Sequence, residues 1–250
     1  MQITWDLVRD ELIGNDAEIE TPYGSRRITY ADFTASGRGI GFIERYISTI
    51  LESYANTHTE DDTTGLLTSK RLAAAEWTIK RHLNAEKGYK LIAVGAGSTA
   101  AINRLQEILG IYVPPATWER IEAMARDVSG KHEALLEALR KNGPVVFVGP
   151  YEHHSNEITW REGLAEVVEI DLTDDGYLDL GDLELKLQRP EYQGRQLIGS
   201  FSAASNVTGI KTPVYPVAAL LHRYGALAFF DYSASAPYVT IEVHRDDDTY

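Results

Sequence analysis

The stretch Val145-Val146-Phe147-Val148, followed at once by Gly149-Pro150-Tyr151-Glu152-His153-His154-Ser155-Asn156, decides the fold class. Four consecutive apolar residues, three of them β-branched, are typical of a strand buried on both faces of a parallel sheet. Similar short runs occur at residues 90–94, 166–170, 197–201 and 226–230. Together these runs predict an α/β protein with a mostly parallel sheet.

Longer stretches with helical spacing of apolar residues separate the predicted strands. They predict helices over residues 66–83, 98–109, 118–139 and 216–224. Alternating strands and helices indicate a sheet flanked by helices. The chain shows no internal repeat and no convincing linker. We therefore expect one large domain over residues 28–250, preceded by an N-terminal arm over residues 1–27.

Composition restricts the class of protein. The chain has 250 residues, a formal net charge of −13 and no cysteine. An acidic chain lacks the basic surface that binds nucleic acid or an anionic membrane, and without cysteine it has no disulfide, thiolate zinc site or cysteine nucleophile. The sequence shows no signal peptide. It also shows no apolar run of about 20 residues, which is the length that spans a bilayer. We expect a cytoplasmic protein with no nucleic-acid or membrane partner.

In a parallel α/β sheet, ligands bind at the carboxyl ends of the strands, so the residues after each run are the candidates for a site. Gly97, Ser98 and Thr99 follow residues 90–94 and lead into a predicted helix. Free N–H groups and the helix dipole at such a position favour a phosphate group. The alternative is an ordinary turn in which Ser98 or Thr99 caps the helix.

Residues 95–100 also match a loose dinucleotide-binding pattern, G-x-G-x-x-A, which raises the alternative of an NAD-binding Rossmann-type dehydrogenase. That pattern requires an acidic residue at the end of a second strand, about 20 residues further on. Glu119 and Glu122 stand at this distance, within a predicted helix rather than at a strand end. Their position weighs against NAD.

Three further strand ends carry polar residues. His153 and His154 offer flat rings that can stack on an aromatic cofactor or exchange protons. As an alternative, Glu152 and one histidine would ligate a metal, although their spacing does not favour it. Asn206 is either an amide donor or an Asx-turn residue. Asp231 is either a buried carboxylate that requires a cationic partner or a residue of a helix N-cap or surface turn. A phosphate cradle, a stacking ring, an amide and a carboxylate are what a phosphorylated pyridine ring requires.

Taken in order, these motifs resemble the class V aminotransferase family within the fold type I pyridoxal-phosphate (PLP) enzymes. The greatest similarity is to the branch of cysteine desulfurases and selenocysteine lyases. The resemblance covers the chain from about residue 28 to its end and rests on six segments: Tyr30-Ala31-Asp32-Phe33-Thr34-Ala35-Ser36, Tyr54-Ala55-Asn56-Thr57-His58, Gly97-Ser98-Thr99-Ala100-Ala101-Ile102-Asn103, Glu152-His153-His154-Ser155-Asn156 with Trp160, Ser205-Asn206-Val207-Thr208-Gly209, and Asp231 with Ser235-Ala236-Pro237.

The resemblance implies a PLP enzyme that acts on a small amino acid, forms a homodimer and uses no metal. His153, stacked on the ring, and Asp231, paired with the pyridine nitrogen, would be the catalytic residues. Asn206 would bind the phenolic oxygen of the ring. The cofactor-binding set that the resemblance implies is Gly97, Ser98, Thr99, His153, His154, Asn206, Asp231 and Ser233.

This sequence departs from the family pattern at three places. Ala234 stands where many desulfurase-like relatives have glutamine, and the connection over residues 111–142 is long. The Ser-x-His-Lys segment that carries the cofactor lysine in the family does not occur between Asp231 and Tyr250. We therefore expect the N-terminal part of an enzyme, truncated before the lysine and inactive by itself, in which residues 1–27 belong to the small domain. The alternative is a non-catalytic truncated relative that binds PLP or a protein partner.

Overall fold

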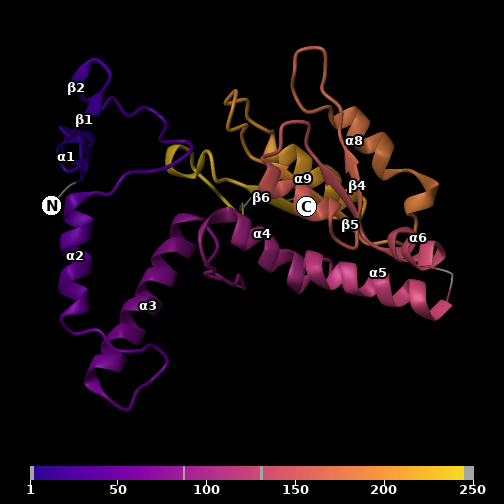
Figure 1. The fold of residues 1–250 in the computed structure, drawn as a ribbon, viewed down its shortest axis with the longest axis horizontal. Helices are drawn as coiled ribbons and strands as arrows, with labels where there is room; N and C mark the ends of the chain where they lie inside the picture. Colours follow the sequence, from indigo (N-terminus) through magenta and orange to yellow (C-terminus); the bar gives the residue numbers. More distant parts are fainter. Residues whose placement is uncertain (1–2, 87, 130–131, 245–250) are drawn as a thin grey trace. The chain divides into compact units, whose positions relative to one another are not determined.

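The computed structural model describes residues 3–86, 88–129 and 132–244 (Figure 1). The chain divides into two compact units. The first comprises Met1–Leu91 with Thr240–Asp246, and the second comprises Ile92–Val239 with Asp247–Tyr250. The candidate site residues named above all belong to the second unit. The assignment of residues 1–27 and 28–250 to separate domains stays a prediction.

Helices and one hairpin make up the described part of the first unit. Its helices are α1 (Trp5–Asp10), α2 (Gly41–Leu51) and α3 (Thr63–His82), and strands β1 (Glu18–Thr21) and β2 (Gly24–Arg27) pair antiparallel. Only α3 was predicted, over residues 66–83. It begins earlier because the Asp62 carboxylate accepts a hydrogen bond from the Gly65 N–H at 2.7 Å, which is a typical N-cap.

The second unit is built around a parallel sheet in the order β4-β3-β5-β6. Its strands are β3 (Val145–Val148), β4 (Glu166–Glu169), β5 (Leu197–Ser202) and β6 (Leu227–Asp231). Four of the five predicted strands and the α/β class are thereby confirmed. Residues 90–94 are the exception, because within the described ranges they have no hydrogen-bonded neighbour and form no strand. An extended run becomes a strand only when another strand pairs with it.

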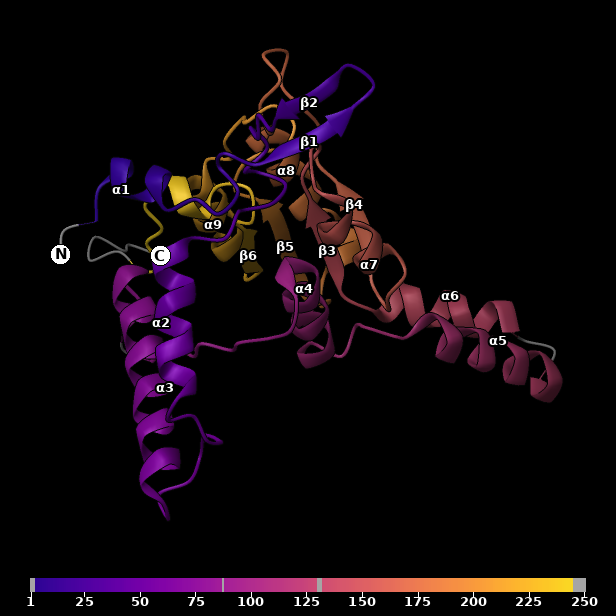
Figure 2. The same cartoon turned by 60° about the vertical axis from the view of Figure 1, so that its left-hand side comes forward.

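Helices pack on both faces of this sheet (Figure 2). Val145 and Phe147 face a core completed by α8 (Leu180–Leu187) and α9 (Val214–Arg223). Val146 and Val148 point the other way, into a core with α4 (Gly97–Ile108) and α7 (Ile158–Arg161). Both faces of β3 are therefore buried, which explains why its sequence does not alternate between apolar and polar residues.

The long helix predicted over residues 118–139 was wrong. The chain forms two helices there, α5 (Pro115–Ser129) and α6 (His132–Asn142), which contact each other. Residues 130–131 lie outside the described ranges; the glycine at position 130 is a poor helix former. Short 3-10 helices are η1 (His154–Asn156), η2 (Pro190–Tyr192) and η3 (Ala236–Tyr238). No helix among the described residues is long and apolar enough to cross a membrane.

Candidate functional site

The topology of the sheet brings the predicted site residues to one edge. Strand β5 pairs with β3 on one side and with β6 on the other, and all three run parallel. Ser200 lies opposite Val148, and Ser202 lies opposite Asp231, so the three strands end close together. The segments that carry His153, Asn206 and Asp231 therefore leave the sheet from the same edge.

Glu152 holds two of these segments together. Its carboxylate accepts hydrogen bonds from the Gly149 N–H at 3.2 Å, the Asn156 side-chain amide at 2.7 Å, the Ser202 N–H at 2.8 Å and the Ser202 hydroxyl at 2.6 Å. Burial raises the pKa of Glu152 above its ordinary value, and the four hydrogen bonds offset only part of this effect. The carboxylate thus connects the end of β3 to the end of β5.

Asn156 extends this network into the core. Its side-chain oxygen accepts from the Ser200 hydroxyl at 2.6 Å and from the Trp160 indole N–H at 3.3 Å, and its amide donates to Glu152. Asn156 and Trp160 are buried. Sequence reasoning did not recognise Glu152 and Asn156 as supports of the site. A signal was available, since both lie within eight residues after a fully buried strand.

A chain of hydroxyl groups joins the predicted phosphate cradle to the histidines. The Thr99 hydroxyl lies 2.7 Å from the Ser155 hydroxyl, which in turn lies 2.9 Å from Nδ1 of His153. The Ser155 backbone N–H donates to the same Nδ1 at 3.2 Å. His153 and His154 are exposed, and their ring centroids are 6.1 Å apart. The face of the His153 ring is therefore accessible to a flat ligand.

The N-terminus of α4 has the open backbone that a phosphate site needs. Its N-cap residue is Ala96, which supplies no side-chain hydrogen bond, so the predicted alternative of capping by Ser98 or Thr99 is wrong. Gly97 has a φ of +73° and no atom within 4 Å of the place where a Cβ would stand. The first N–H groups of the helix are thus left for another acceptor.

Asn206 is exposed, and its side chain makes no hydrogen bond to any other described residue. The turn it occupies is closed by its neighbour: the Ser205 hydroxyl accepts from the Val207 and Thr208 N–H groups, both at 3.2 Å. The Asx-turn alternative for Asn206 is therefore wrong, and its amide is available to a ligand.

Asp231 ends β6 and is half-buried. Its Oδ1 accepts from the Ser233 N–H at 2.8 Å and from the Ser233 hydroxyl, while Oδ2 has no hydrogen-bond partner in the described ranges. Ser233 was predicted to bind the cofactor, and here its hydroxyl is directed at Asp231. One carboxylate oxygen is thus held by Ser233 and the other is open.

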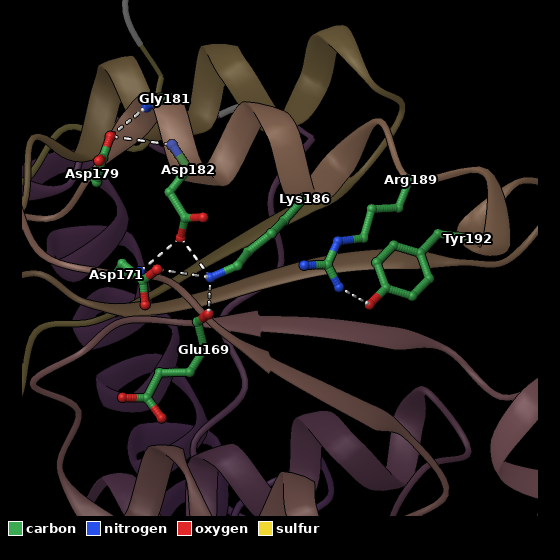
Figure 3. Close-up of polar contacts among 8 residues, drawn as sticks. All are labelled: Glu169, Asp171, Asp179, Gly181, Asp182, Lys186, Arg189 and Tyr192. Atoms are coloured by element: carbon green, nitrogen blue, oxygen red, sulfur yellow. Dashed lines mark hydrogen bonds and ion pairs between the residues drawn. The ribbon is translucent and has the colours of Figure 1, made fainter.

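A second polar cluster, at the end of β4, is closed (Figure 3). The Lys186 ammonium lies 2.6 Å from Asp182 Oδ2, 2.7 Å from the Glu169 carbonyl and 3.6 Å from Asp171 Oδ2. Asp182 also accepts from the Asp171 N–H at 2.8 Å, and Asp179 caps α8. Since Lys186 is held by these oxygens, it is not a free amine.

Neither alternative chemistry finds support in the geometry. No group of three or more histidine, aspartate or glutamate side chains in the described part of the chain is placed to hold a metal ion, and Glu152 already has four donors. For NAD, Glu119 and Glu122 lie inside α5 and not at a strand end. The run before the glycine-rich turn is also not a strand, so the context of a dinucleotide fold is missing.

Comparison with known proteins shows which proteins the chain resembles. Residues 132–247 match the family model described as Aminotransferase class-V. A probable cysteine desulfurase from Chlamydia muridarum is 42% identical over 93 residues, which are 36% of this chain and 22% of that protein. Another, from Halalkalibacterium halodurans, is 26% identical over 223 residues, which are 87% of this chain and 47% of that protein.

Two solved structures have the same fold. A cysteine desulfurase from Thermococcus onnurineus gives a TM-score of 0.65 at 20% identity, covering 97% of this chain and 50% of that one. The cysteine desulfurase CsdA from Escherichia coli gives 0.63 at 20% identity, covering 97% and 52%. The fold is therefore that of these two cysteine desulfurases. The chain thus matches the class V aminotransferase model over residues 132–247 and resembles cysteine desulfurases, of which it spans about half the length or less.

Proposed function

We propose that this chain is the cofactor-binding part of a PLP-dependent enzyme that acts on a small amino acid, with cysteine desulfurase-like or aminotransferase-like chemistry. One observation carries the proposal: four groups that a ligand can reach meet at one sheet edge, while the residues that support them are hydrogen-bonded to one another. The open groups are the first N–H groups of α4, the His153 ring, the Asn206 amide and Oδ2 of Asp231. They match the needs of a phosphate, a flat ring, a phenolic oxygen and a protonated pyridine nitrogen.

The phosphate end of the cofactor would bind at α4. The first N–H groups of the helix and the hydroxyls of Ser98 and Thr99 would donate to the phosphate oxygens. Gly97 supports this role because its positive φ and its open surroundings leave room for a close approach to the backbone. PLP itself, when bound, withdraws electrons from a carbanion at the substrate.

The ring end would be held by His153, with His154 beside it, and by Asp231. An aspartate that accepts a hydrogen bond from the pyridine nitrogen keeps a proton at that atom, because its negative charge favours the cationic form. Ser233 would fix the orientation of Asp231 through Oδ1, leaving Oδ2 for the nitrogen. Asn206 would donate to the phenolic oxygen, and Ala234 would add no contact there.

The substrate assignment rests on the relatives, whose names specify cysteine desulfurases. We therefore place desulfuration of cysteine before transamination. We also propose a cytoplasmic homodimer.

Titration of the purified protein from the complete reading frame with PLP tests the proposal. Visible absorbance should report saturable binding, and Asp231→Ala should weaken it. Lys186→Met is the matched control, because the cluster of Lys186 lies at the end of β4 and is closed. Release of sulfide from cysteine would establish the desulfurase, whereas binding without turnover of any amino acid would favour the non-catalytic relative. No saturable binding of PLP would refute both.

A further inference from the structure

The hydroxyl groups of Thr99 and Ser155 form a chain of hydrogen bonds from α4 to His153. Each hydroxyl donates its one proton along the chain in a single direction, and Thr99 determines which direction that is. A backbone N–H can only donate, so the Ser155 N–H at 3.2 Å from Nδ1 requires that this nitrogen carry a lone pair and no proton. The imidazole proton of His153 is then on Nε2. Since Nδ1 is an acceptor, the Ser155 hydroxyl at 2.9 Å from it must donate as well.

The next link follows from the count of protons. Each hydroxyl has one proton, and that of Ser155 is used at Nδ1. At 2.7 Å from Ser155, the Thr99 hydroxyl must therefore donate to Ser155. With no anion at α4, the chain of donors runs from Thr99 through Ser155 to His153. Contact between α4 and η1 keeps the three groups together.

An anion at the N-terminus of α4 reverses this order. If Thr99 donates its proton to a phosphate oxygen, it can only accept from Ser155. Ser155 then donates to Thr99, and its oxygen lone pairs face the lone pair of Nδ1. Nδ1 keeps the backbone N–H as its one donor, and the separation between Nδ1 and the Ser155 oxygen increases.

We propose that Ser155 is a positioning residue that fixes the His153 tautomer, with the proton on Nε2, and that reports occupancy of the phosphate cradle to this ring through Thr99. The inference rests on the proposed function, because it takes the phosphate of the cofactor as the anion at α4. It assigns to Ser155 a role distinct from binding the cofactor: the ring that would stack on the cofactor senses whether the phosphate end is bound.

Nitrogen-15 NMR of the histidine rings in the labelled full chain tests the first part without any cofactor. The His153 signals are assigned by their loss in His153→Gln. In the anion-free protein, Nδ1 of His153 should show the shift of an unprotonated nitrogen and Nε2 that of a protonated one. Ser155→Ala keeps the backbone N–H and should keep this tautomer, but the loss of the hydroxyl donor should move the Nδ1 shift; Ser155→Thr, which keeps the hydroxyl, should restore the wild-type shift. A proton on Nδ1 in the wild type would overturn the proposal.

Inorganic phosphate tests the second part, with the Gly97 amide signal as the reporter of binding. Phosphate should shift the Nδ1 signal of wild-type His153 and should shift it much less in Ser155→Ala and in Thr99→Val. Equal shifts in all three proteins would mean that the phosphate charge acts through space, which would overturn the relay. Failure of PLP to bind in the absorbance titration would refute the proposed function and leave the cofactor-free tautomer result unchanged.

Discussion

Two polar clusters lie at the carboxyl ends of the strands, and they differ in how many of their polar groups have hydrogen-bond or ion-pair partners. At the end of β4, Lys186 is surrounded by Asp182, Asp171 and the Glu169 carbonyl, and Asp179 caps α8 (Figure 3). At the ends of β3, β5 and β6, the side chains of Glu152 and Asn156, which support the site, have hydrogen-bond partners. The Asn206 amide and Oδ2 of Asp231 beside them have none among the described residues.

The difference separates structural polar groups from ligand-binding ones. A half-buried carboxylate oxygen without a partner, such as Oδ2 of Asp231, costs free energy, and proteins rarely leave one so unless a ligand completes it. The Asn206 amide is exposed, so it is free to bond water or a ligand. The cluster around Lys186 is complete, so its loss should affect only folding. The open groups should affect ligand binding and contribute little to folding. Glu152 and Asn156 should affect both, because they connect the core to the open groups.

The largest expected effect is that of Asn156→Leu. This change leaves the Ser200 hydroxyl, the Trp160 N–H and one Glu152 oxygen short of a partner inside the core. We expect a loss of roughly 3 kcal/mol in the free energy of unfolding, since each unsatisfied buried group costs about 1–3 kcal/mol. Urea denaturation measures it. The control is Asn206→Leu at an exposed position, which should retain wild-type stability and lose PLP affinity; equal stability losses would contradict the comparison.

Glu152→Gln should follow, with a loss of about 2 kcal/mol at neutral pH. The side-chain NH₂ group of glutamine is a donor, and it would face N–H groups that now donate to the Glu152 carboxylate. Each buried donor left without an acceptor costs about 1–3 kcal/mol. Guanidinium denaturation at neutral pH measures this loss. An unchanged stability there would show that the four hydrogen bonds to the carboxylate are not needed.

The pH dependence of the same variant sharpens the test. Burial raises the folded-state pKa of Glu152 above its ordinary 4.5, so the folded state binds more protons than the unfolded state between the two values. The part of the stability that comes from the protonation of folded Glu152 is therefore fully present below pH 4.5 and is lost as pH rises through the raised pKa, while the hydrogen bonds to the carboxylate remain. The stability deficit of Glu152→Gln should grow as pH falls over this window. A deficit that shrinks would contradict the direction of the shift.

Lys186→Met should cost about 1.5 kcal/mol in the free energy of unfolding. The methionine keeps the apolar part of the side chain, while Asp182 and the Glu169 carbonyl lose their cation, and hydrogen bonds to charged groups contribute about 1.5–3 kcal/mol. Thermal denaturation measures the loss, and the absorbance titration should show an unchanged PLP affinity. A weakened affinity would show that the closed cluster also serves the site.

Local sequence patterns were sufficient for most of the second unit. Strands β3 to β6 and helices α4 and α9 were predicted from apolar runs and helical spacing, because burial on one or both faces leaves a regular trace in the sequence. Residues 90–94 carry the same trace and form no strand, since pairing depends on another segment. The prediction of one helix over residues 118–139 failed because spacing alone does not separate two adjacent helices.

The individual residues of the candidate site were predictable from the sequence, but the hydrogen bonds that join them were not. Asn206 and Asp231 were recognised from their positions after apolar runs. The roles of Glu152 and Ser155 were not, because each depends on a partner far along the chain: Ser202 for Glu152, and Thr99 for Ser155. The hydroxyl of Ser155 has several ordinary uses near a turn, and only the fold selects one of them.

The smallest free-energy change is expected for Asp231→Asn, and it concerns binding rather than folding. An asparagine can keep the Ser233 contacts through its oxygen, so stability should change by less than about 0.5 kcal/mol. At the pyridine nitrogen, the variant replaces a charged acceptor by a neutral amide, which weakens a charge-assisted hydrogen bond. We expect roughly tenfold weaker PLP binding, or about 1.4 kcal/mol, in the absorbance titration. Unchanged affinity together with lost stability would place Asp231 with the closed cluster and remove the distinction between the two regions.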